Sequence, residues 1–182
     1  MKKVLFLFVL ISGFAFGQME NFVIENNQVR WNKVYETTKT FDELKEAVRS
    51  NAKLKITSET ENSLTGEFSD LVMNYKKAGF SYMSTPMILN ETNAYHGGFK
   101  IDFKEGRYRA TITNAKTGGK TLSVYSGGIG LGSQINTTME IMALNNKGEV
   151  RKAFPKVAGK ILDTTFTDFM DLNTQNTDDS DW

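Results

Sequence analysis

The sequence contains no cysteine, and this absence excludes several kinds of structure and chemistry. No disulfide can hold the fold together, so burial of apolar side chains has to do so. Neither a thiol nucleophile nor a thiolate metal ligand is available. Histidine occurs only once, at His96, and one imidazole needs several carboxylates beside it to complete a zinc site. We therefore expect no metal site and no cofactor.

The chain also lacks an excess of either charge. It carries 22 basic and 21 acidic residues, and two of the lysines lie in the N-terminal segment considered next. Domains that bind nucleic acid usually show a basic excess. The balance therefore gives no reason to expect nucleic acid as a partner.

Residues 1–17 have the pattern of a secretory signal peptide. Two lysines precede the apolar run Val4–Ile11, and Ala15-Phe16-Gly17 places small residues before a cut at Gln18. The apolar run is shorter than the ~20 residues that cross a bilayer, and no cysteine follows the cut to carry a lipid. We expect an exported protein, periplasmic or secreted, that has no membrane anchor.

Two segments have the periodicity of amphipathic helices. Thr40 and Glu43 form a capping box, and apolar residues recur behind it at three- and four-residue spacing, which predicts a helix over Phe41–Asn51. Pro155 suits the first turn of a second helix over Pro155–Leu172. Residues 173–182 are polar and acidic, which predicts a disordered tail.

Alternating apolar and polar residues predict strands elsewhere. The clearest signal is a hairpin around Glu105-Gly106, and further segments read as strands or as extended chain: Phe22–Ile24, Val29–Glu36, Leu54–Thr57, Ser63–Phe68 and Asp70–Asn93. Residues 114–120 break the pattern, and residues 126–133 are rich in glycine, which predicts a mobile loop. We predict an α+β fold in a single domain over residues 18–172. In it, a twisted antiparallel sheet is covered on one face by two helices, and its other face stays polar and open.

Four of these segments, taken in order, resemble a known family. They are the strand Val29–Glu36, the capped helix, the strand end Leu64-Thr65-Gly66 and the hairpin Phe103–Ile112. Together they look like the domain of unknown function with a TBP-like fold that is common among secreted proteins of Bacteroidota. The resemblance covers Val29–Asn114 and implies a twisted antiparallel sheet backed by two helices. It implies no activity, because that family has none assigned.

The strongest cluster of like charge lies on the polar side of the predicted hairpin: Lys100, Lys104, Arg107 and Arg109. One interpretation is a contact with an anion or an acidic surface, helped by Tyr82 or Tyr95 if they lie nearby. The alternative is a solvated face in which Asp102 and Glu105 pair with the cations, each surface pair contributing ~0–1 kcal/mol.

Other motifs predict no chemistry. Gly118-Gly119-Lys120-Thr121 resembles the end of a phosphate-binding loop, but Asn114 stands where that motif needs a glycine. Gly128–Gly132 lacks the spacing of a dinucleotide-binding turn. We interpret His96 as a solvated turn residue.

Three hypotheses for the function remain open. The first is a non-enzymatic binding module of the cell envelope that presents its open sheet face to a protein, a peptide or a glycan. The second is a small-ligand carrier in which the glycine-rich segment closes over the aromatic-rich residues 71–89. The third is a hydrolase that uses carboxylates such as Asp70, Glu91 or Asp102. No catalytic residue is assigned.

Overall fold

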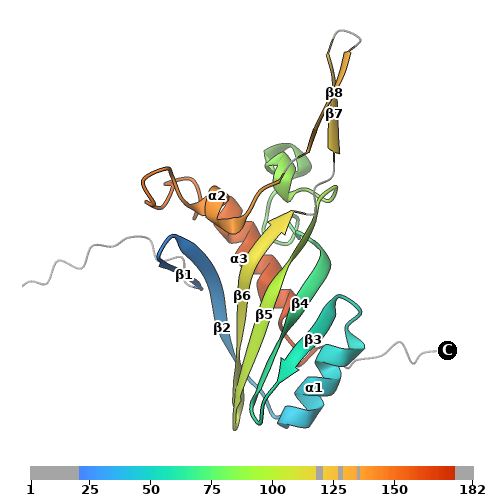
Figure 1. Ribbon diagram of the computed structural model, residues 1–182, viewed down its shortest axis with the longest axis vertical. Coiled ribbons are helices and arrows are strands. Elements are labelled where there is room, and N and C mark those ends of the chain that lie inside the picture. Colours follow the sequence, from blue (N-terminus) through green and yellow to red (C-terminus); the bar gives the residue numbers. More distant parts are fainter. Residues whose placement is uncertain (1–20, 118–120, 127–128, 135, 175–182) are drawn as a thin grey trace, which may run out of the picture.

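The computed structural model describes residues 21–117, 121–126, 129–134 and 136–174, whose arrangement Figure 1 shows. Six strands form one sheet: β1 (Phe22–Glu25), β2 (Gln28–Glu36), β3 (Leu54–Glu59), β4 (Ser63–Val72), β5 (Ala94–Lys104) and β6 (Arg107–Thr117). A separate hairpin beyond one end of this sheet consists of β7 (Thr121–Ser126) and β8 (Ile129–Gln134). The helices are α1 (Phe41–Ser50), α2 (Met139–Ala143) and α3 (Ala158–Phe169), with short 3₁₀ helices η1 (Tyr82–Ser84) and η2 (Met87–Leu89).

The strand order across the six-stranded sheet is β1-β2-β6-β5-β4-β3, and all neighbouring strands are antiparallel. Strands β3 to β6 follow one another as a meander. Strand β2 joins them on the far side of β6, so α1 carries the chain from one part of the sheet to the other. The hairpin β5–β6 consequently lies in the middle of the sheet.

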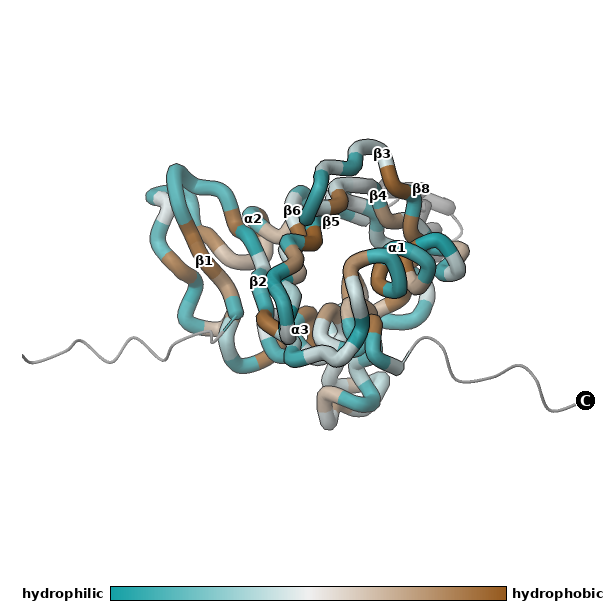
Figure 2. The backbone as a smooth tube through the Cα atoms, turned by 90° about the horizontal axis from the view of Figure 1, so that it is seen from below, coloured by the Kyte–Doolittle hydropathy of each residue, from teal (hydrophilic) through white to brown (hydrophobic). Residues whose placement is uncertain are grey.

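Both longer helices cover the same face of the sheet, as predicted. Figure 2 shows the strands as an arc with α1 and α3 on its inner side. Trp31 of β2 meets Phe166 of α3 with ring centroids 5.7 Å apart, and Phe103 of β5 meets Phe41 of α1 at 5.8 Å. The protein therefore has an α+β fold with an antiparallel sheet. We call the uncovered side of this sheet the open face.

Polar groups fix α3 against the sheet. The buried Trp31 donates its indole N–H to Asp163 Oδ1 over 2.7 Å. Tyr35 and Tyr108 donate their hydroxyls to carbonyl oxygens at the C-terminal end of α3 and just beyond it. Burial raises the pKa of both phenols above the usual range. These bonds satisfy polar groups that would be costly to bury alone.

The predicted helices and strands agree with the structure where the pattern is local. The capping box at Thr40 is present, with both of its hydrogen bonds. The strands of the predicted hairpin are longer than expected, because β6 continues through Asn114 to Thr117 instead of breaking there. Asn114 adopts a left-handed φ of 52°, and this accommodates the irregularity within the strand.

Two predictions about irregular segments were wrong. Residues 73–93 do not pair as extended chain; they form turns and the helices η1 and η2. The side chains of the buried Asn90 and Asn93 form hydrogen bonds with the nearby backbone, which in a strand would pair with a neighbouring strand. The glycine-rich segment is not a loop over Ile129–Gln134, where it pairs with β7 as strand β8.

Several expectations concern residues outside the described part of the chain. The proposed signal peptide, Gly118-Gly119-Lys120, Gly127 and Gly128, and residues 175–182 of the acidic tail all lie there. Within the described ranges, none of the helices has both the length and the apolar character that crossing a bilayer requires.

Candidate functional site

The four predicted cations lie together on the open face. Lys100 and Lys104 are outward-facing positions of β5, and Arg107 and Arg109 are outward-facing positions of β6. The register places Lys104 directly opposite Arg107, next to the turn of the hairpin. Alternation in the sequence thus located these side chains correctly on the outer face of the hairpin.

Two of the four cations are neutralised in part by Asp102. Its carboxylate accepts from Lys100 Nζ at 2.6 Å and from Arg109 Nη2 at 2.9 Å. Partial burial favours the neutral acid, but the hydrogen bonds from the two cations outweigh it and lower the pKa of Asp102. This agrees with the interpretation of a solvated, paired face for these two residues.

The other two cations have no such partner. Among the described residues, neither Lys104 nor Arg107 forms an ion pair, and Glu105 forms none either. Glu36 of β2 is opposite Arg107 in the register but is not within ion-pair distance. Like charges directly opposite each other in a sheet repel. An anion between Lys104 and Arg107 would relieve this repulsion. We call these two residues the hairpin pair.

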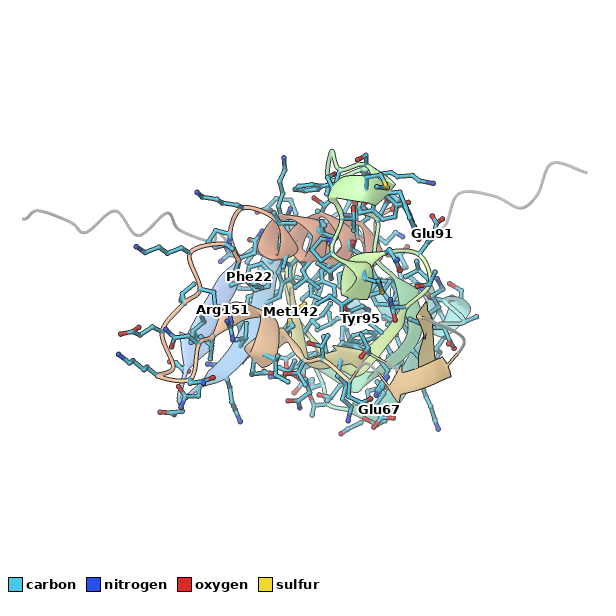
Figure 3. The ribbon with its side chains drawn as sticks, turned by 90° about the horizontal axis from the view of Figure 1, so that it is seen from above. Phe22, Glu67, Glu91, Tyr95, Met142 and Arg151 are labelled. Atoms are coloured by element: carbon cyan, nitrogen blue, oxygen red, sulfur yellow. The ribbon has the colours of Figure 1, made fainter. Side chains whose placement is uncertain are left out.

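A cleft of about 530 Å³ opens at the other end of the same face, among the ends of β3 to β6. It is lined by Ala52, Lys53, Leu54, Lys55, Glu67, Phe68, Ser69, His96, Gly97, Gly98, Asn114 and Lys116. Figure 3 shows Glu67 pointing outward on the side away from α3, while Tyr95 lies inside the molecule.

Irregular strand pairing creates this cleft. The register shifts between β4 and β5 at Phe68–Leu71, and between β5 and β6 at His96–Gly98. Such bulges bend a strand and increase its twist. Gly98, which is opposite Thr113, has no side chain to fill the space between the strands. Gly97 and Gly98 therefore contribute only backbone to the floor between the strands, beside the side chains of Leu54 and Phe68 in the lining.

The rim of the cleft is basic. Lys55 is opposite Glu67, and Lys116 is opposite His96. In the part of the chain that the structure describes, Lys53, Lys55 and Lys116 form no ion pair. Three lysines thus surround the cleft with Glu67 as the one acid of its lining.

His96 is not the turn residue that we predicted. It lies within β5, half-buried, and its ring belongs to the cleft. The two glycines that follow it suggested a turn, but they belong to a bulged strand. Among the described residues, no group of three or more potential metal-binding side chains lies close together, so His96 has no partners for a metal ion.

The two tyrosines that we considered as neighbours of the four cations do not lie on the open face. Tyr95 is completely buried and donates its hydroxyl to the carbonyl oxygen of Ile88. Tyr82 is exposed, but it belongs to η1 and not to the sheet. The described outward strand positions hold no phenylalanine, tyrosine or tryptophan, and the rings near this face are those of His96 and Phe68 in the lining of the cleft.

Among the described residues, the arrangement does not support the hydrolase hypothesis or the small-ligand carrier hypothesis. Asp70 is an exposed residue at the irregular part of β4, Asp102 is held by Lys100 and Arg109 on β5 and β6, and Glu91 lines a separate cleft beside Tyr75 and Lys76. Figure 3 shows Glu67 and Glu91 far apart, and the two residues line different clefts. The lid of the proposed carrier is a strand over residues 129–134.

Two solved structures are similar to this chain. A DUF4468 family protein from Bacteroides ovatus aligns with a TM-score of 0.48 and 11% identity, over 88% of this chain and 94% of that one. A TBP-like protein from Parabacteroides distasonis aligns with a TM-score of 0.46 and 14% identity, over 86% of this chain and 98% of that one. No family model and no curated protein matches the sequence. Neither name states a ligand or an activity.

Sequence reasoning missed the lysines of the cleft. Lys55 and Lys116 stand at polar positions of alternating segments, but they are 61 residues apart in the chain. Only the pairing of four strands, with two register shifts, brings them to one cleft.

Proposed function

We propose that this protein is an exported, non-enzymatic binding module that holds an acidic protein partner on the open face of its sheet. The observation that carries this proposal is the hairpin pair, Lys104 opposite Arg107, which has no ion-pair partner among the described residues. Export is supported by the signal-peptide pattern of residues 1–17.

The distribution of charge on the open face supports an acidic partner. Its exposed and half-buried strand positions hold more cations than acids: Arg30, Lys55, Lys100, Lys104, Arg107, Arg109 and Lys116 against Glu25, Glu36, Glu67, Asp70 and Asp102. The chain as a whole has almost equal numbers of both. A local basic surface on a balanced protein attracts acidic partners and orients them without a general affinity for polyanions.

Outside the cleft, the described strand positions of the open face offer no aromatic ring on which a ligand could stack. Sugar rings and nucleobases are commonly held against aromatic side chains, and around the hairpin pair the described outward positions contain none, because the rings of His96 and Phe68 belong to the cleft. Carboxylates of a protein partner need only the cations and hydroxyl groups that the face provides. An acidic protein is therefore favoured over a glycan or a nucleic acid.

The test measures binding of a fluorescent decaglutamate peptide to residues 18–182, before and after the double substitution Arg107→Ala plus Arg109→Ala. Each exposed ion pair contributes up to ~1 kcal/mol, so we expect the double variant to bind about tenfold more weakly. Both side chains are exposed, so the thermal midpoint should hardly change.

The matched control removes the same charge elsewhere, by Lys152→Ala plus Lys156→Ala, two exposed positions between α2 and α3. This control should bind the peptide like the unaltered protein. Undiminished binding by the arginine variant, or an equal loss in the control, would refute a role for the open face. Export is tested by the mass of the protein recovered from the envelope fraction, which should begin at Gln18.

A further inference from the structure

We propose that the basic cleft is a second contact point for the same partner, and that the partner lies as an extended acidic polypeptide segment along β5 and β6. This inference rests on the proposed function, because it assigns the hairpin pair to one end of that segment. It adds a second binding site, a path for the bound segment along β5 and β6, and a minimum length for that segment.

The cleft is suited to a carboxylate group. Lys55 and Lys116 line it from opposite sides, from β3 and from β6, and neither forms an ion pair with a described residue. The missing side chain at Gly98 leaves the backbone of the floor accessible between them. Serine and asparagine side chains, Ser69 and Asn114, add hydrogen-bond donors to the lining.

The spacing of the two sites determines the length of the ligand. From His96 at the cleft to Lys104 of the hairpin pair is eight residues along β5, or about 26 Å at 3.3 Å per residue. An extended peptide advances by about the same distance per residue. A segment of eight or more residues therefore reaches both sites, and one of four residues reaches only one.

The cations in the middle of this path are already paired. There Asp102 already neutralises Lys100 and Arg109 in part, and Thr111 is opposite Lys100. Free cations thus concentrate at the two ends of the path. A ligand that binds at one end is already held close to the other end, so the second contact forms within the complex and raises the overall affinity.

The experiment compares decaglutamate with tetraglutamate on residues 18–182 and on two double variants. The cleft variant is Lys55→Gln plus Lys116→Gln, and the hairpin variant is Lys104→Gln plus Arg107→Gln. We expect decaglutamate to bind the unaltered protein at least about a hundredfold more tightly than tetraglutamate. Each variant should weaken decaglutamate binding by at least about tenfold, since each removes two exposed ion pairs, and complete loss of one site would remove the whole advantage over tetraglutamate.

Conservative replacement provides the control for folding. Lys55→Arg plus Lys116→Arg keeps the charge of the cleft and should retain decaglutamate binding. A loss in this variant equal to that of the glutamine variant would overturn the proposal, because it would trace the effect to packing and not to charge.

The outcomes separate this inference from the proposed function. If the hairpin variant weakens decaglutamate binding and the cleft variant does not, the proposed function stands and the second site is wrong. If decaglutamate does not bind at all, both are wrong. Equal affinities for the long and the short peptide would overturn the extended path.

Other occupants of the face give distinct results, each of which contradicts the proposal. One is tighter binding of a sulfated oligosaccharide of equal charge. Another is self-association that the cleft variant abolishes, which would assign the face to a second copy. The third is peptide binding that appears only after removal of residues 175–182, which would assign it to the chain's own acidic end.

Discussion

Neighbouring glycines in β5 provide a test of how the cleft is built. An added methyl group at Gly97 would point to the covered side of the sheet, 2.8 Å from the Phe68 ring and 2.8 Å from the carbonyl oxygen of Thr113. At Gly98 it would point to the open face, with the Thr113 hydroxyl oxygen at 3.0 Å as its nearest contact. The substitutions Gly97→Ala and Gly98→Ala therefore add the same atom on opposite faces.

The expected stability changes follow from these contacts. At Gly97 the strand partner's backbone has to move, and such overpacking costs ~1–3 kcal/mol. Replacing glycine by alanine also restricts the unfolded chain, which stabilises by ~0.4–1 kcal/mol where the backbone is compatible. We expect Gly97→Ala to lower the free energy of unfolding by about 1–2 kcal/mol. At Gly98 the hydroxyl can rotate away, so the change should stay within about 0.5 kcal/mol of zero.

Urea denaturation of residues 18–182 followed by tryptophan fluorescence measures both values, since Trp31 is buried against α3. Decaglutamate binding is the second measurement. Gly98→Ala should weaken it with the fold intact, because the methyl group occupies the floor of the cleft. A larger loss of stability for Gly98→Ala than for Gly97→Ala would refute the assignment of the two faces, and with it the description of the cleft.

Two further predictions concern single charges and caps. Asp102→Asn removes the ion pairs with Lys100 and Arg109, so it should cost at most ~2 kcal/mol of stability, up to ~1 kcal/mol for each pair. It should tighten decaglutamate binding in a titration, and weaker binding would contradict the open-face site. Thr40→Ala should destabilise the protein by ~0.5–2 kcal/mol in urea at neutral pH. Hydrogen bonds from the Thr40 backbone and side chain hold the pKa of Glu43 below its ordinary 4.5, so their contribution is present above that pH and is lost as the pH falls through the lowered value. Thr40→Ala removes only the bond from the hydroxyl, because alanine keeps the backbone N–H. The stability difference between Thr40→Ala and the unaltered protein should therefore shrink in acid by the share of the hydroxyl bond, and a constant difference would exclude a contribution of that bond.

The predictable parts of the fold are those that depend on neighbours in the sequence. The capping box at Thr40 uses residues three positions apart, and the β5–β6 hairpin joins segments separated by a two-residue turn. Such contacts can be recognised from spacing. The basic residues of the hairpin were placed on the open face for the same reason.

The segment between β4 and β5 could not be predicted this way. Its apolar residues have no regular period, and burial of Met73, Tyr75 and Leu89 depends on α3 and the sheet, which come from other parts of the chain. Asn90 and Asn93 hold the turns by side-chain hydrogen bonds to nearby backbone. The intrinsic preference of these residues for strands is weaker than the combined effect of this burial and these hydrogen bonds.

Local order in the sequence was sufficient for the α+β class, the two covering helices and the polar, open sheet face, because alternation and helical periodicity record which side of each element is buried. The absence of cysteine, also visible in the sequence, excluded disulfides and thiolate chemistry. The cleft was decided only by the tertiary structure. Its lysines come from strands far apart in the chain, and two register shifts determine which residues face one another. The same pairing concentrates cations on one face of a chain whose total charge is nearly balanced, because composition counts charges and only the fold positions them.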